Sequence, residues 1–105
     1  MNSKFLNMLG LCRRAGKFAG GHDAAFDSIS KNKAAGCYLT QDASERLKKE
    51  FRETTCFEGR KVPLTELNCT MYDIQTATGR KAAVFTVNDA GFQKKLTELL
   101  SEEDS

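Results

Sequence analysis

The sequence predicts a single α/β domain, a three-layer α/β/α sandwich built on a four-stranded mixed sheet. Its 105 residues give room for one hydrophobic core. Segments with the apolar period of a helix alternate along the chain with short apolar segments that favour strands. Such alternation is typical of a parallel or mixed sheet with helices on both faces. We therefore expect five helices and four strands, and assign one domain to residues 1–100.

The first predicted helix covers residues 3–15. Ser3 is a residue type that caps helix starts, and Gly16 is the type that most often follows a helix end. Four apolar side chains at helical spacing form one face of this helix: Phe5, Met8, Leu9 and Cys12.

A short strand over residues 17–19 and a turn at Gly20 and Gly21 lead into a second helix, which we expect over residues 22–31. Three side chains of this helix are expected to point into the core: Ala25, Phe26 and Ile29.

The middle of the chain predicts a strand over residues 36–41 and a third helix over residues 42–58. Asp42 is expected to begin this helix, with Glu45 three residues later completing a capping box. We extend the helix to residue 58 because no helix-breaking residue precedes Gly59.

The last third predicts strands over residues 62–67 and 82–87. Pro63 suits an edge strand, or the start of one, because proline donates no hydrogen bond to a neighbour. The second strand is an uninterrupted apolar run, which is typical of burial on both faces. A helix over residues 71–77, capped by Thr70, connects the two strands.

A final helix is expected to begin at Asn88 or Asp89 and to end at Leu100. Residues 101–105 hold three acids and no base, and we expect them to form a disordered, solvated tail. The net charge of +2 does not by itself indicate nucleic acid. Four basic pairs fit either one phosphate-binding face or a scattered surface: Arg13-Arg14, Arg60-Lys61, Arg80-Lys81 and Lys94-Lys95.

The four cysteines are widely spaced and form no C-x-x-C pair: Cys12, Cys37, Cys56 and Cys69. We expect free, buried thiols in a cytoplasmic protein, because the sequence has no secretory signal. The single histidine, His22, leaves no Cys/His zinc spacing, so neither a metal nor a cofactor is expected. No apolar run has the length of a membrane span.

An enzymatic function would need a nucleophilic cysteine beside a base, and His22 is the only histidine. The sequence has neither a Walker-type loop nor a dinucleotide fingerprint. We therefore expect no catalytic residues. The alternative gains weight if His22 lies within hydrogen-bond reach of a cysteine or carboxylate in a pocket.

The glycine turn is the first candidate binding site. Gly20 and Gly21 lead directly into a helix N-terminus, where free N–H groups and the helix dipole favour an anion such as an RNA phosphate. The alternative is plain turn chemistry, because the carboxylate of Asp23 can accept from those N–H groups and repel phosphate. Arg80 and Lys81, on the loop before the last strand, form a second candidate.

Three segments carry a resemblance to a known family: MLGLCRRAGKFAGG, CYLTQDAS and TGRKAAVFTVNDAGFQKKLTELL. Together they resemble the bacterial YlxQ-type proteins of the ribosomal L-seven-Ae / L-thirty-e family of kink-turn RNA binders, and the likeness covers residues 3–100. The resemblance implies an α/β/α sandwich, RNA as the ligand and no enzymatic activity. It also implies that residues 20–27 and 78–82 form the RNA-facing surface.

The sequence departs from the family pattern at the start of the second helix. The strongest kink-turn binders of the family carry an Asn-Glu pair there and a lysine one turn later. This chain has Asp23 and Ala24 at the pair and Asp27 at the lysine. Because Asp27 reverses a charge that faces phosphate, the resemblance implies weakened kink-turn binding. His22 is expected to compensate by stacking on a base, or as a cation at lower pH.

We expect a monomeric, non-catalytic binder of structured RNA, kink-turn-like or ribosomal, associated with the ribosome or another ribonucleoprotein. A protein-interaction module that has lost RNA binding is the alternative, and the acids of the second helix motivate it. The candidate RNA-binding residues are Lys17, Gly20, Gly21, His22, Asp23, Asp27, Arg80 and Lys81.

Overall fold

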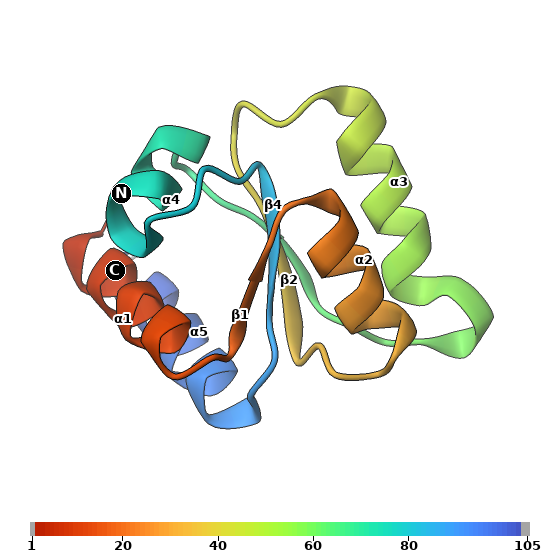
Figure 1. The fold of residues 1–105 in the computed structure, drawn as a ribbon, viewed down its shortest axis with the longest axis horizontal. Coiled ribbons are helices and arrows are strands. Elements are labelled where there is room, and N and C mark those ends of the chain that lie inside the picture. The colour runs from red at the N-terminus through yellow and green to blue at the C-terminus, as the bar shows by residue number, and fades with distance from the viewer. Residues whose placement is uncertain (1, 104–105) are drawn as a thin grey trace.

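The computed structural model describes residues 2–103 and confirms helices on both faces of a four-stranded sheet (Figure 1). The helices are α1 (Ser3–Arg14), α2 (His22–Ser30), α3 (Glu45–Cys56), α4 (Met71–Thr78) and α5 (Ala90–Glu103), with a 3₁₀ turn η1 (Phe57–Gly59). The strands are β1 (Phe18–Gly20), β2 (Gly36–Leu39), β3 (Leu64–Glu66) and β4 (Val84–Val87). Each helix and strand overlaps a predicted element of the same type, so the predicted order is confirmed.

The sheet has the strand order β1-β4-β2-β3 and is mixed, as predicted. β4 runs antiparallel to β1 and β2, whereas β2 and β3 are parallel. Leu39, the last residue of β2, pairs with Val84 at the start of β4 and with Glu66 at the end of β3. Gly20, the last residue of β1, also pairs near the start of β4. These four strand termini lie at one end of the sheet, which we name the Gly21 end after the residue that follows β1.

Helices α1, α4 and α5 cover one face of the sheet, and α2 and α3 cover the other (Figure 1). The two central strands, β2 and β4, are buried along their whole length, which explains the apolar run of β4. On the first face Tyr38 stacks on Phe85 at 5.1 Å and donates a 2.6 Å hydrogen bond to Oε1 of Gln93. Ile29 and Phe51 are fully buried on the second face.

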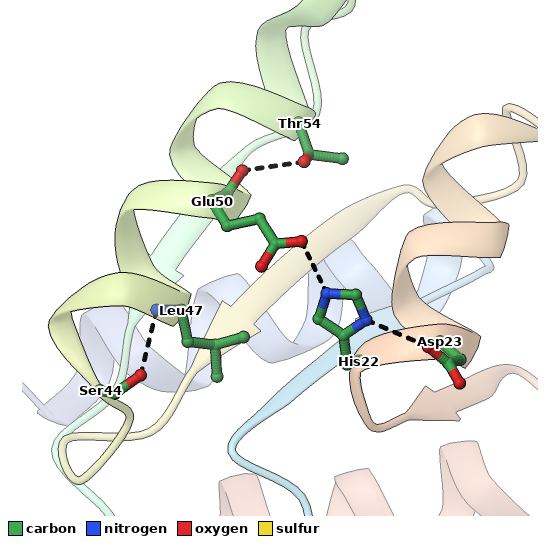
Figure 2. Close-up of polar contacts among 6 residues, drawn as sticks. All are labelled: His22, Asp23, Ser44, Leu47, Glu50 and Thr54. Carbon is green, nitrogen blue, oxygen red and sulfur yellow. Dashed lines mark hydrogen bonds and ion pairs between the residues drawn. The ribbon is translucent and has the colours of Figure 1, made fainter.

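The prediction that Asp42 begins the third helix is wrong. Ser44 caps α3, and its hydroxyl accepts a hydrogen bond from the N–H of Leu47 at 3.1 Å (Figure 2). The carboxylate of Asp42 accepts instead from the N–H of Met71 at 3.1 Å, at the start of α4. A residue with the local signature of a cap thus stabilises a helix start 29 positions away.

Other helix boundaries differ by a few residues. Asn2 rather than Ser3 caps α1, because its side chain accepts from the N–H of Lys4 at 2.8 Å. The third helix ends at Cys56 rather than at residue 58, because the chain leaves the helical conformation and Glu58 takes a positive φ of 54°.

Two side chains that were expected to be buried are exposed. Phe26 is 44% exposed, because Ala25 and Ile29 define the face of α2 that contacts the sheet. Cys56 is also exposed, whereas the other three thiols are buried as predicted, and none of the four cysteines forms a disulfide.

The last helix extends beyond its predicted end at residue 100, so residues 101–103 of the expected acidic tail are helical. Residues 104–105 of that tail lie outside the described part of the chain. Between residues 2 and 103 no helix is both long enough and apolar enough to cross a bilayer.

Candidate functional site

The two candidate loops are neighbours at the Gly21 end. Gly21 has a φ of 99°, and its N–H donates to the carbonyl of Val84 at 2.8 Å, which holds the turn against β4. A Cβ placed on Gly21 would lie 2.8 Å from Nη2 of Arg80, and one placed on Gly20 would lie 3.4 Å from Cδ of the same side chain. The Arg80 side chain therefore lies across the glycine turn.

Helix α2 begins without a side-chain cap. The N-cap position is Gly21, and the carboxylate of Asp23 contacts the ring of His22 rather than the first N–H groups of the helix. The positive end of the helix dipole and the guanidinium of Arg80 thus lie at the same place. Both features stabilise an anion, so the turn is suited to a phosphate or a carboxylate.

The loop after α4 is held in a defined conformation. Gly79 ends α4 with a φ of 82°, and the hydroxyl of Thr78 accepts from the N–H of Arg80 at 3.2 Å. Lys81 lies against α4 instead, with Nζ 3.2 Å from the hydroxyl oxygen of Tyr72 and 4.4 Å from its ring centroid. Within residues 2–103 neither Arg80 nor Lys81 forms an ion pair with a carboxylate.

Both ring nitrogens of His22, the first residue of α2, are in contact with carboxylates (Figure 2). Nε2 lies 2.7 Å from Oε1 of Glu50 on α3, and Nδ1 lies 3.1 Å from Oδ1 of Asp23. The ring is parallel to Phe26 at 6.3 Å and edge-on to Phe51 at 5.5 Å. The hydrogen bond with Glu50, followed by the one with Asp23, raises the pKa of His22 above its ordinary value.

The Gly21 end has two sides of different charge. Asp23 and Asp27 lie on α2, and Glu50 on α3 contacts His22 at the start of that helix. Asp27 is partly neutralised by an ion pair with Lys31 at 3.1 Å. Arg80 and Lys81, which form no ion pair with a carboxylate among residues 2–103, lie on the loop after α4. An anionic ligand is therefore favoured on the α4 side and disfavoured beside the acids of α2.

Lys17 is separated from the other candidate residues. Its carbonyl accepts from the N–H of Asn88 at 2.7 Å, just beyond the end of β4. Because Phe18 pairs with Val87, Lys17 lies at the end of the sheet opposite Gly21. The remaining candidates lie at the Gly21 end or on the helix that starts there: Gly20, Gly21, His22, Asp23, Asp27, Arg80 and Lys81.

Two further residues of this end, Glu50 and Tyr72, are absent from the sequence-based candidates. Glu50 is 28 positions from His22, and only the packing of α3 against α2 brings it there. Tyr72 could have been identified from the sequence. It is an aromatic residue in the first turn of α4, outside the apolar face to which Ile74 belongs.

The contacts between His22 and its carboxylates lie on an open surface, since the side chains of His22 and Glu50 are 46% and 42% exposed.

Burial raises the pKa of Cys12 to about 11 and that of Cys37 to about 12, so these two thiols stay protonated near neutral pH. The described residues contain no group of three or more His, Cys, Asp or Glu side chains that could hold a metal ion.

The fold and this site define a class of protein: a small α/β/α sandwich that presents an uncapped helix start and unpaired cations at one end of its sheet. No family model matches the sequence. The chain is 34% identical over 97 residues to the RNA-binding protein YlxQ of Enterococcus faecium, and the match covers 92% of this chain and 91% of that protein. The chain therefore belongs to the YlxQ family, as its resemblance implied.

Solved structures share the fold. A protein of unknown function from Bacillus halodurans superposes with a TM-score of 0.82 and 26% identity, over 93% of this chain and 97% of that one. A 15.5 kD RNA-binding protein of Giardia lamblia has a TM-score of 0.70 over 95% of this chain and 84% of that one. At 14% identity the second structure shows a common fold and no more.

Proposed function

We propose that this chain is a monomeric, non-catalytic binder of structured RNA, kink-turn-like or ribosomal, within the ribosome or another cytoplasmic ribonucleoprotein. Its RNA face is the Gly21 end, with Gly20, Gly21, His22, Arg80 and Lys81 in contact with the RNA. The observation that carries the proposal is the Arg80 side chain across the start of α2. The name of the Enterococcus relative, an RNA-binding protein, supports the same ligand.

A phosphate at the glycine turn would meet three favourable features at once. The uncapped N–H groups of α2 donate hydrogen bonds, and the guanidinium of Arg80 adds a positive charge with several donors. Gly20 and Gly21 carry no Cβ, which leaves room for the Arg80 side chain to lie against the turn where the phosphate binds. His22 adds a flat ring at the same helix start.

The acids of α2 set the direction in which the RNA leaves the turn. Asp23 and Asp27 repel phosphate, and Glu50 adds a third carboxylate on that side. The RNA therefore runs from the glycine turn toward Arg80 and Lys81, away from the acids of α2. Asp23 and Asp27 remain at the edge of the face, where they lower the affinity.

The test is a titration of the protein with a kink-turn oligonucleotide and a straight duplex of equal length, at two salt concentrations. Arg80→Glu reverses a charge on the proposed face, and Lys17→Glu makes the same change at the opposite end of the sheet. We expect binding that weakens with salt, a loss of roughly tenfold or more for Arg80→Glu, and little change for Lys17→Glu.

The outcomes separate the finer alternatives. A preference for the kinked RNA supports a kink-turn ligand, and equal binding of both RNAs supports a more general structured-RNA role. An absence of binding to either RNA at low salt overturns the proposal. Equal losses for the two charge reversals would place the RNA elsewhere on the molecule.

A second candidate is a protein-interaction module on the same fold. Phe26 and Phe57 are 44% and 59% exposed and flank a groove of about 340 Å³ between α2 and α3. The acids Asp23, Asp27 and Glu50 lie on the same side of the molecule. A defined partner that stays bound after nuclease treatment, and that Phe26→Ala releases, would favour this candidate.

A further inference from the structure

Tyr72 is the exposed aromatic residue beside the proposed RNA face. It lies in the first turn of α4, and 61% of it is exposed. The turn that carries it is rigid, because Thr70 caps α4 and Asp73 completes a capping box with it. The backbone that carries the ring is therefore fixed, and the ring lies outside the core near the Gly21 end.

A cation lies directly on this ring. Nζ of Lys81 is 4.4 Å from the ring centroid of Tyr72 and 3.2 Å from its hydroxyl oxygen. Thr78 and Gly79 fix the backbone of the loop that carries Lys81, so its ammonium group is held within reach of the ring. Within the described residues no carboxylate pairs with Lys81, and its charge stays available to an anion.

An exposed aromatic ring beside an unpaired cation matches the chemistry of an unpaired nucleotide. The ring offers a stacking surface to any base, and the ammonium group offers a contact to the adjoining phosphate. Arg80, one residue before Lys81, lies on the glycine turn. A strand whose phosphate lies at Arg80 can therefore continue past Lys81 to Tyr72 on α4.

We propose that Tyr72 and Lys81 bind a single-stranded extension of the RNA that occupies the Gly21 end. A base of the extension stacks on the Tyr72 ring, and the Lys81 ammonium moves from the ring to the phosphate of that nucleotide. This inference rests on the proposed function, because the structured part of the RNA places the extension. It adds a second contact region, on α4, and a role for a residue outside the two candidate loops.

The experiment compares one structured RNA in three forms: blunt, with a short single-stranded 5′ extension, and with the same extension at the 3′ end. The base analogue 2-aminopurine in the extension reports stacking through the quenching of its fluorescence. Tyr72→Ala removes the ring, Tyr72→Phe keeps it, and Phe57→Ala removes an equally exposed ring far from the Gly21 end. Because Tyr72 and Phe57 are both exposed, all three variants are expected to melt at nearly the wild-type temperature.

We expect one of the two extensions to increase the affinity of the wild type and to be quenched on binding. Tyr72→Ala should lose about 5- to 150-fold in affinity for that RNA and keep its affinity for the blunt form. Tyr72→Phe and Phe57→Ala should retain the gain. If the wild type binds blunt RNA and neither extension adds affinity, or if Tyr72→Ala retains the gain, this inference is overturned and the proposed function stands. If the wild type binds no blunt RNA, the proposed function itself fails.

Discussion

Nε2 of the His22 imidazole lies 2.7 Å from Oε1 of Glu50, and this contact joins the first turn of α2 to α3 (Figure 2). The second ring nitrogen faces Asp23, so the ring lies between two carboxylates. Protonation makes both contacts charge-assisted, which is why the pKa of His22 is raised. The cluster therefore keeps His22 protonated to a higher pH than that of an ordinary imidazole.

The first prediction concerns pH and stability. Because folding raises the pKa of His22, the folded state binds the proton more tightly than the unfolded chain does. The stabilisation is complete below the ordinary value of 6.5 and is lost as the pH rises through the raised value. Urea unfolding should show that His22→Gln destabilises the protein more at pH 5.5 than at pH 9, by at most about 1 kcal/mol because the cluster is exposed.

The single histidine allows a direct control. Its ring protons give one NMR titration curve, and we expect a midpoint above 6.5 in the wild type. Glu50→Gln removes the leading cause of the shift and should lower that midpoint. A wild-type midpoint at or below 6.5 would show that the contact with Glu50 is not formed in solution.

The second prediction concerns the glycine turn. Gly21 combines a φ of 99° with a ψ of 164°, a region that side chains essentially never adopt, and a Cβ there would also displace Arg80. Gly21→Ala should lower the free energy of unfolding by about 1–3 kcal/mol and weaken RNA binding. Gly16→Ala is the matched control, because Gly16 has a φ of 74° with nothing within 4 Å of its Cβ position. It should lose stability only, and equal RNA losses in both variants would contradict the role of Arg80.

The third prediction concerns the buried tyrosine. The hydroxyl of Tyr38 donates a 2.6 Å hydrogen bond to the partly buried side chain of Gln93. Tyr38→Phe leaves the packing intact and an acceptor without its donor, and should cost about 1 kcal/mol or somewhat more in urea unfolding. Tyr72→Phe makes the same chemical change at an exposed site and should be close to neutral. Equal effects at the two positions would mean that the Tyr38 hydroxyl is solvated rather than paired.

The order of helices and strands could be predicted because each segment carries its own periodicity and caps. Thr70 and Gly79 illustrate this, since both bound α4 by local chemistry that is visible in the sequence. Asp42 illustrates the limit, because its carboxylate serves α4 across the fold while Ser44, two residues on, caps α3. The strand order also could not be predicted from local sequence, because strand pairing depends on how the two layers of helices bury the sheet.

The site could be predicted only in part, for a related reason. The glycine turn and the Arg80 loop each have a local signal, and the resemblance placed them on one surface, where the structure has them in contact. Nothing in the sequence near His22 identifies Glu50 as its partner, because the contact depends on the packing of two helices. Lys17 is close to the glycine turn along the chain, yet β1 separates them and Lys17 lies at the other end of the sheet.

The last prediction tests the acidic side of the proposed RNA face. Asp27 lies on α2 one turn after Asp23 and forms an ion pair with Lys31 at 3.1 Å. Asp27→Lys removes a repulsive charge and adds an attractive one, so affinity for the structured RNA should rise severalfold to about tenfold. The slope of the logarithm of the binding constant against the logarithm of the salt concentration should become more negative by about one. The lost ion pair and the new repulsion with Lys31 should together cost less than about 1 kcal/mol of stability.

Glu98→Lys provides the control for this prediction. Glu98 is exposed on α5, on the opposite face of the sheet, and its replacement changes the net charge by the same amount. If both variants raise affinity equally, the effect is that of net charge and says nothing about the face. If Asp27→Lys leaves the affinity and the salt dependence unchanged, the RNA does not extend along α2. Its contacts then lie wholly on the α4 side of the glycine turn, with Arg80 and Lys81.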